Sequence, residues 1–238
     1  MTALSECRGS LLTAIKFSQS EISQREKRRG DTWPAYDRDF HAYMVDFSHV
    51  VNEAVLFMQL ERIQSPVIID FMSSTYAIAS LLVDLGNKDG LGIAVGRKDN
   101  RDIFQKRRDE SLGIHQIAGD LLQGRVWAET RKLLSGRKAN LILEDGALAW
   151  DFIPNNRGLY GLMLNRTWDL LSSEGGVLLA EIPTTEELVS AEVSMTEWRD
   201  MLLRDGIDFE YANLELNKVG LLRLRKTPDS PISLPQLA

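Results

Sequence analysis

The 238-residue sequence has little of the chemistry that builds metal centres and covalent cross-links. Cys7 is its only cysteine, so an internal disulfide and a thiolate-rich metal site are both excluded. The three histidines, His41, His49 and His115, lack the spacing of metal ligands and fit surface or packing positions. The sequence therefore predicts no metal site.

Long apolar runs are also missing. Stretches such as Ala77–Val83 are far shorter than the roughly 20 residues that a membrane-spanning helix needs. The first six residues do not have the charged and then apolar layout of a signal peptide. We therefore expect a cytoplasmic protein without a membrane segment.

Positive charge is not in excess either, because the formal net charge is −6. Proteins that bind nucleic acid without specificity usually present a basic field, so this charge argues against such a role for the whole molecule. One local exception is the stretch from Arg97 to Arg108, in which basic residues outnumber acidic ones. This stretch keeps an RNA backbone or another phosphate-bearing ligand open as a partner.

The composition is that of an ordinary globular protein, 44% hydrophobic and 26% charged. The apolar residues follow one pattern before Pro66 and another after it. From His41 to Ile63, apolar residues recur with the 3.6-residue period of one long amphipathic helix. After Pro66, helical patterns separate five short apolar segments: Val67–Phe71, Leu91–Val95, His115–Ala118, Asn140–Leu143 and Gly176–Ile182. Such strands, apolar on both faces, predict an α/β fold whose parallel sheet is covered by helices on both sides.

The C-terminal part departs from this alternation. Ser194 and Glu197 form a capping box that predicts the start of a helix. The extended segments Phe209–Leu216 and Val219–Leu224 follow, and a connection of two residues requires them to pair antiparallel. The sheet is therefore expected to end in a hairpin.

These patterns divide the chain into three parts. We expect a helical N-terminal extension over 1–64, an α/β domain over 65–226 and a flexible, proline-containing tail over 227–238. The extension is also a candidate surface for a partner or for a second copy of the chain.

Alternating strand and helix units, followed by a helix and an antiparallel hairpin, resemble the class I S-adenosylmethionine-dependent methyltransferases over about residues 41–226. The resemblance implies a Rossmann-like, seven-stranded, mostly parallel sheet. It also implies S-adenosylmethionine as the cofactor and transfer of a methyl group to an acceptor. The acceptor class stays open between a small molecule, a protein and RNA.

The resemblance further implies a cofactor site after the first three strands and a catalytic site after the fourth. The family has an acidic residue and a glycine-rich turn after its first strand. Here Asp70 is present, but Met72, Ser74 and Tyr76 replace the glycines. The implied cofactor-binding residues are Asp70, Met72, Ser73, Ser74, Gly96, Arg97, Asp120 and Leu121, and the implied catalytic residues are Glu144 and Asp145.

Two departures from the family pattern keep other functions open. The turn after Asp70 lacks glycine, and Gly96 and Arg97 stand where the family has a carboxylate for the ribose hydroxyls, so that Asp99 is the nearest acid. A noncatalytic module that keeps the fold, contacting a partner, RNA or another phosphate-bearing ligand, is therefore the alternative. A nicotinamide-dependent dehydrogenase is disfavoured because Gly-x-Gly-x-x-Gly is missing after the first strand.

Overall fold

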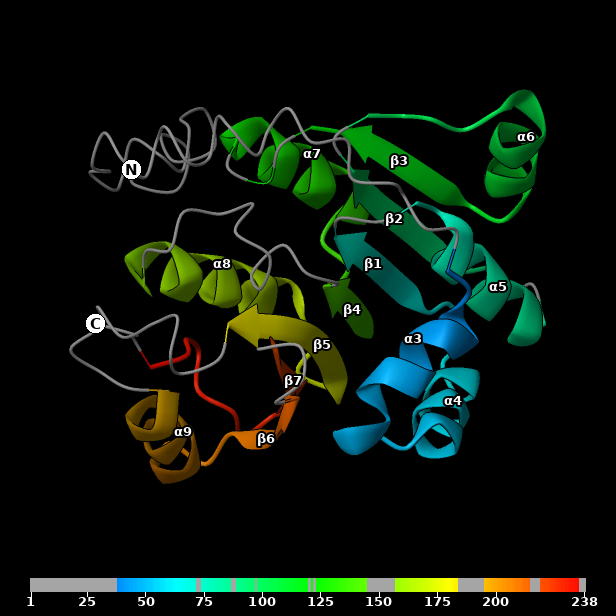
Figure 1. Ribbon diagram of the computed structural model, residues 1–238. Helices are drawn as coiled ribbons and strands as arrows, with labels where there is room; N and C mark the ends of the chain where they lie inside the picture. Colours follow the sequence, from blue (N-terminus) through cyan, green and yellow to red (C-terminus); the bar gives the residue numbers. More distant parts are fainter. Residues whose placement is uncertain are drawn as a thin grey trace.

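A computed structural model describes residues 38–71, 74–86, 89–96, 98–119, 121, 123–144, 157–183, 195–214 and 219–235. Its centre is a seven-stranded sheet of order β3-β2-β1-β4-β5-β7-β6 (Figure 1). The parallel strands are β1 (Val67–Phe71), β2 (Leu91–Gly96), β3 (Ile114–Ala118), β4 (Leu141–Glu144) and β5 (Gly176–Pro183). The five strands expected from the apolar segments are thus confirmed, with boundaries shifted by one residue at most.

The last two strands form the expected antiparallel hairpin, β6 (Asp208–Leu214) and β7 (Val219–Lys226). β7 inserts between β5 and β6, pairing antiparallel with both, so that Gly176 lies opposite Lys226 and Asp208 lies opposite Arg225. The observed sheet is therefore mostly parallel with one reversed strand, β7, as expected. The Rossmann-like fold class is confirmed.

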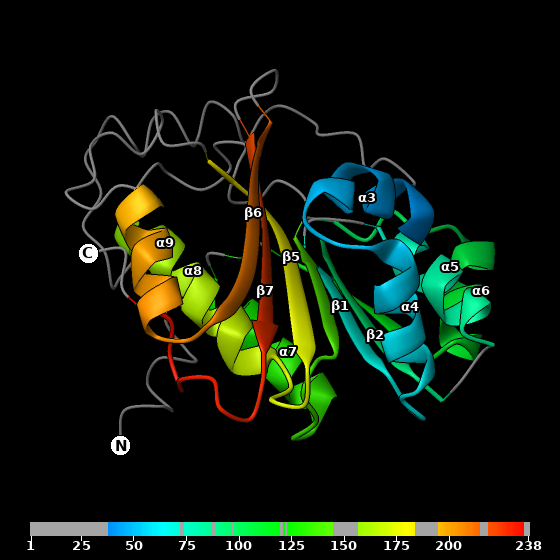
Figure 2. The same ribbon diagram turned by 90° about the horizontal axis from the view of Figure 1, so that it is seen from below.

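Helices cover both faces of the sheet (Figure 2). One apolar core joins the sheet to α5 (Tyr76–Asp84), α3 (Phe40–Asp46) and α4 (Glu53–Glu61). A second core, on the opposite face, joins it to α7 (Gly124–Leu134), α8 (Arg157–Leu170) and α9 (Met195–Arg204). The helix α6 (Ile103–Ser111) lies between β2 and β3 in the chain and begins with a capping box of Asp102 and Gln105.

The single long helix expected from His41 to Ile63 is wrong. The chain forms α3, a short 3₁₀ helix η2 (Phe47–His49) and then α4, which starts afresh after Asn52. The Asn52 side chain accepts a hydrogen bond from the Val55 N–H at 3.1 Å and so caps the new helix. The periodicity of apolar residues indicates which side chains are buried. It does not reveal an interruption between two helices when the second helix begins at a capping residue such as Asn52.

The described part of the N-terminal extension packs directly on the α/β core. Phe40, Tyr43 and Phe47 are buried in the same apolar core as α5. The Phe40 N–H donates to Ser80 Oγ at 2.8 Å, and Arg223 Nε of β7 donates to the Val50 carbonyl at 3.2 Å. This segment is a structural layer of the fold, while residues 1–37 lie outside the described part of the chain.

The segment after β7, which the prolines mark as a flexible tail, is packed over residues 227–235. Trp168 Nε1 donates to the Pro231 carbonyl and Trp198 Nε1 donates to the Pro235 carbonyl, both at 3.0 Å. Leu234 is 3% exposed and its N–H donates to Asn165 Oδ1. The prolines by themselves do not predict this packing, because the two tryptophans that hold the segment lie far away in the sequence.

No helix in the described part of the chain is both long and apolar enough to cross a membrane.

Candidate functional site

The candidate site lies where β1, β2, β3 and β4 end, at one edge of the sheet (Figure 1). From β1 the chain proceeds to β2 and β3 on one side, and β4 then returns to the other side of β1. Open α/β sheets bind ligands outside the carboxyl ends of the strands at such a reversal point. The crevice between the ends of β1 and β4 is therefore the expected ligand position.

Two buried carboxylates mark this position. Asp70 in β1 is 0% exposed and Glu144, the last residue of β4, is 2% exposed. In the β1–β4 register, Phe71 pairs with Glu144 while Asp70 pairs with Leu143. Since paired residues share a face, Asp70 is directed to the α5 side of the sheet and Glu144 to the α7 and α8 side. The two carboxylates share an edge but face opposite layers.

The turn after β1 ends in a polar helix start. Ser74 Oγ accepts a hydrogen bond from the Tyr76 N–H at 3.3 Å. Thr75 is the N-cap of α5 and is buried, but its side chain makes no capping bond to the helix. Instead its Oγ1 accepts a hydrogen bond from Arg108 of α6 at 3.1 Å, and the Arg108 guanidinium also lies 5.6 Å from the centre of the Tyr76 ring.

Tyr76, which stands where the resemblance implies a glycine, is 38% exposed. Its bulk is therefore partly in solvent. Met72 and Ser73, the two other candidates in this turn, lie outside the described residues.

A buried ion pair connects this turn with the loop after β2. Asp109 of α6 is fully buried and accepts hydrogen bonds from Arg101 at 3.0 Å and from Arg108 at 2.7 and 3.0 Å. Arg101 belongs to the loop after β2, and Arg108 reaches Thr75 after β1. One carboxylate thus organises both loops that flank the candidate site.

The same contacts pair part of the basic stretch from Arg97 to Arg108, which the sequence leaves open as a phosphate contact. Arg101 also donates to Asp99 at 2.9 and 3.1 Å, and Lys106 lies 3.7 Å from Asp99. The hydrogen bond from Arg101 lowers the pKa of Asp99 from 3.8 to about 2, while Asp99 in turn raises the pKa of Arg101. Arg101, Lys106 and Arg108 are therefore paired with carboxylates of the protein itself.

The ends of β2 and β3 are closely joined. Gly96 pairs with Ala118, and the Gly96 carbonyl accepts from the Gly119 N–H at 2.8 Å. A Cβ on Gly119 would lie 2.5 Å from Val126 Cγ2, so the close approach of β3 to α7 requires glycine there. Arg125 donates to the Ala118 carbonyl at 2.9 Å and so lies at the end of β3.

Leu121, a candidate cofactor contact, is mainly a core residue. It is 4% exposed, and its carbonyl accepts a hydrogen bond from Trp127 Nε1 at 2.7 Å. Arg97, Asp120 and Asp145 lie outside the described residues, so their candidate roles stay predictions.

Sequence reasoning missed Thr75 and Asp109, and it named Arg108 only as part of a basic stretch, not as a partner of the turn after β1. Pairing between α6 and α5 leaves no sequence pattern, because the partners are 33 residues apart. The capping box of Asp102 and Gln105 was the available signal, since it marks the start of α6. Among the described residues, no three histidine, cysteine, aspartate or glutamate side chains gather as they would around a metal ion.

No protein-family model matches the sequence, and no curated protein matches it significantly. Among solved structures, a methyltransferase from Geobacter sulfurreducens is 12% identical, covering 90% of this chain and 98% of that one, with a TM-score of 0.44. The precorrin-6y C5,15-methyltransferase from Geobacter metallireducens is 16% identical over 73% and 87% of the two chains, with a TM-score of 0.40. NSun6 from Pyrococcus horikoshii is 20% identical over 72% and 50%, with a TM-score of 0.42.

Identities below 25% and TM-scores below 0.5 transfer no residue role to this chain. The fold follows from the chain's own sheet: a reversal point between β1 and β4, and an antiparallel β7 inserted between β5 and β6. The chain has a Rossmann-like fold, which is the fold that the resemblance to the class I S-adenosylmethionine-dependent methyltransferases implies.

Proposed function

We propose that this chain is a methyltransferase that uses S-adenosylmethionine to methylate a small molecule, a protein or RNA. The observation that carries the proposal is the pair of buried carboxylates, Asp70 and Glu144, which lie at the carboxyl ends of adjacent strands at the reversal point of the sheet. When bound, the cofactor supplies an activated methyl group, so the protein has mainly to align the reactants.

The start of α5 suits the anionic end of this cofactor. The first turn of α5 contains no acidic residue, and Arg108 is hydrogen-bonded to its N-cap, Thr75. A helix N-terminus next to a guanidinium group favours a carboxylate. We assign Ser74 and this helix start, together with Met72 and Ser73, to the methionine portion, with Asp70 beneath them in β1.

The adenosine portion belongs to the ends of β2 and β3. Gly96 has no side chain to obstruct a ligand, and Arg97, Asp120 and the Leu121 N–H complete this proposed part of the site. Asp99 does not serve the ribose hydroxyls in the usual way, because its carboxylate is bound by Arg101 and Lys106. We therefore expect weaker cofactor affinity than a free carboxylate at the end of β2 would provide.

Glu144 and Asp145 take the acceptor side. A carboxylate at the end of β4 can orient a nucleophile by accepting its hydrogen bond and can take up its proton. Burial of Glu144 strengthens such a hydrogen bond, because little water competes for it.

Calorimetric titration of the full chain with S-adenosylhomocysteine tests the proposal, with thermal unfolding in parallel because a ligand of the native state raises its stability. We expect saturable binding that Arg108→Gln weakens about tenfold, as loss of one charge-assisted contact would. The same variant should bind 5′-methylthioadenosine, which lacks the carboxylate, as well as the unchanged protein does.

The matched control is Glu129→Gln, since Glu129 is exposed on α7. It should leave the affinity for S-adenosylhomocysteine unchanged. Absence of binding at millimolar ligand would refute the methyltransferase proposal and favour a noncatalytic module with the same fold.

A further inference from the structure

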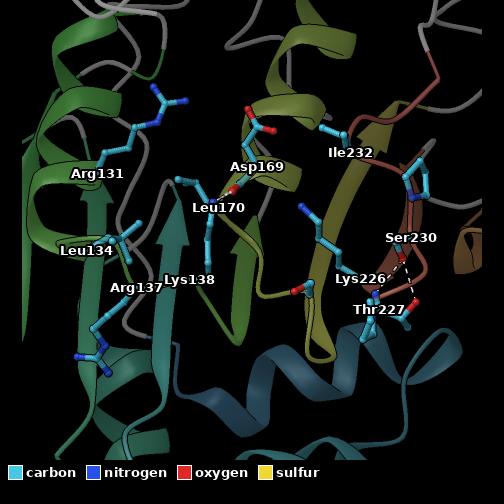
Figure 3. Close-up of a pocket in the computed structure, with 14 residues that line it drawn as sticks. Arg131, Leu134, Arg137, Lys138, Asp169, Leu170, Lys226, Thr227, Ser230 and Ile232 are labelled. Atoms are coloured by element: carbon cyan, nitrogen blue, oxygen red, sulfur yellow. Dashed lines mark hydrogen bonds between the residues drawn. The ribbon is translucent and has the colours of Figure 1, made fainter.

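A cavity of about 600 Å³ (Figure 3) lies at the edge of the sheet opposite the candidate cofactor site. It is formed where α7 and α8 end, where the chain enters β4 and where β7 ends. None of the residues discussed above at the carboxyl ends of β1 to β4 lines it. The cavity is therefore a separate site.

The lining of this cavity is strongly basic. Arg131, Arg137, Lys138 and Lys226 line it together with one carboxylate, that of Asp169, which gives a formal charge of +3. The whole chain, by contrast, carries a formal charge of −6. These residues come from three separate parts of the sequence, so no single run of basic residues predicts the cluster.

Arg137, Lys138 and Lys226 each donate to a backbone carbonyl, which is a neutral group. Lys138 Nζ donates to the Asp169 carbonyl, and Lys226 Nζ donates to the Trp168 carbonyl at 2.8 Å. Arg137 donates to the Ser65 carbonyl at 2.7 Å. Figure 3 shows the two lysines near the middle of the group and the two arginine side chains farther out.

Helix ends offset only part of this charge. The carboxyl ends of α7 and α8 lie here, and each carries about half a negative charge from its unpaired carbonyls. Two helix ends together therefore contribute about one negative charge beside a lining whose formal charge is +3. The pKa of Lys226 is lowered, first by burial and then by the nearby positive charge of Lys138, while Asp169 acts in the opposite direction.

We propose that this cavity binds the phosphate group of a small phosphorylated molecule, up to the size of a nucleotide. A phosphate monoester carries about −1.5 to −2 at neutral pH, a charge opposite in sign to that of the lining. The volume falls within the range of about 300–1,000 Å³ that is usual for small-molecule sites. Pro231 and Ile232 line the same cavity, and Ile232 is 90% exposed, so an apolar surface is available to the organic part.

Titration of the full chain with uridine 5′-monophosphate and with uridine tests this site. The nucleotide should bind saturably and the nucleoside should not, because only the first carries a phosphate. Lys226→Met should weaken nucleotide binding about tenfold or more, as expected for loss of a charge-assisted contact. Lys132→Met is the matched control, since Lys132 is exposed on α7 and does not line the cavity.

A variant that should strengthen nucleotide binding distinguishes a specific effect from general damage to the fold, because a damaged fold would only weaken binding. Asp169 is exposed, and Asp169→Asn removes the one carboxylate, so it should strengthen nucleotide binding several-fold. Equal effects of Lys226→Met and Lys132→Met, weaker binding by Asp169→Asn, or no binding of the nucleotide would each overturn the proposal.

Two competition experiments complete the test. Saturating S-adenosylhomocysteine should not displace the nucleotide, because the two sites lie at opposite edges of the sheet; displacement would overturn the assignment to this cavity. The second competitor is a single-stranded oligouridylate. If it binds far more tightly than the mononucleotide and depends on the same Lys226, the cavity is part of an RNA-binding site, and the proposal of a small-molecule site is overturned.

Discussion

Asp109 illustrates how a single side chain places two loops. A carboxylate removed from water is costly unless its charge is matched, and here two guanidinium groups, from Arg101 and Arg108, bind it. Because Arg108 also holds Thr75, the ion pair extends from α6 to the turn after β1. Asp109 is thus a positioning residue for the proposed cofactor site.

Asp109→Asn should therefore destabilise the protein. We expect the free energy of unfolding to fall by about 3 kcal/mol, because two partly buried guanidinium groups lose their shared counter-charge. Urea unfolding followed by circular dichroism measures this. Glu110→Gln, an exposed change on the same helix, should stay within about 0.5 kcal/mol, and equal losses in the two variants would refute the role of the buried charge.

The pair of Asp99 and Arg101 should make stability depend on pH below about pH 4. The pKa of Asp99 is lowered from 3.8 to about 2 in the native state, so the native state binds fewer protons than the unfolded one in this range. The stabilisation is present above pH 4 and is lost as the pH falls towards 2. Comparison with Asp99→Asn checks this: the difference in unfolding free energy should be constant from pH 7 to 5 and narrow below pH 4.

At the scale of elements, the segment over 227–235 acts as a strap between α8 and α9. Trp168 of α8 and Trp198 of α9 each donate to a carbonyl of this segment, and Leu234 is buried beside them in the same apolar core. A segment without regular secondary structure therefore connects two helices that are not consecutive with it in the chain.

Leu234→Ala should cost about 2 to 3 kcal/mol of unfolding free energy, since it removes a fully packed side chain. Ile232→Ala is a matched control two residues earlier, where the side chain is 90% exposed, and we expect a change below about 0.5 kcal/mol. Chemical denaturation of both variants distinguishes a packed strap from a frayed end, for which neither change would matter.

At the scale of the whole molecule, the sheet carries two apolar layers, and the N-terminal helices are part of one of them. Phe47 is 1% exposed in the layer of α3 and α5, while Trp127, Trp168 and Trp198 are buried in the opposite layer. Because the same strands contribute to both layers, the described chain should unfold as one unit.

Phe47→Ala tests this coupling. It should lower the unfolding free energy by about 3 to 4 kcal/mol and shift the tryptophan fluorescence transition together with the circular dichroism transition. Val45→Ala, on the same turn but 59% exposed, should shift neither. A fluorescence transition that stays in place in Phe47→Ala would show that the N-terminal helices are an independent unit.

The sequence by itself determined the order of the elements. Short, mostly apolar segments such as Val67–Phe71, separated by helical patterns, favour strands buried on both faces, and the short connection before Val219 permits only an antiparallel pair. These local constraints also placed Asp70 and Glu144 at strand ends, where a parallel sheet binds its ligands.

What only the tertiary structure decided is which charges meet. The pattern of a sequence reports burial along one element, but a salt bridge depends on which elements pack together. Arg101, Lys106 and Arg108 of the basic stretch are therefore paired with Asp99 and Asp109, whereas Lys138 and Lys226, 88 residues apart, converge beside the end of α8. The spacing of charged residues along the sequence does not show which of them become neighbours when distant elements pack together. The placement of these sites therefore had to come from the folded molecule.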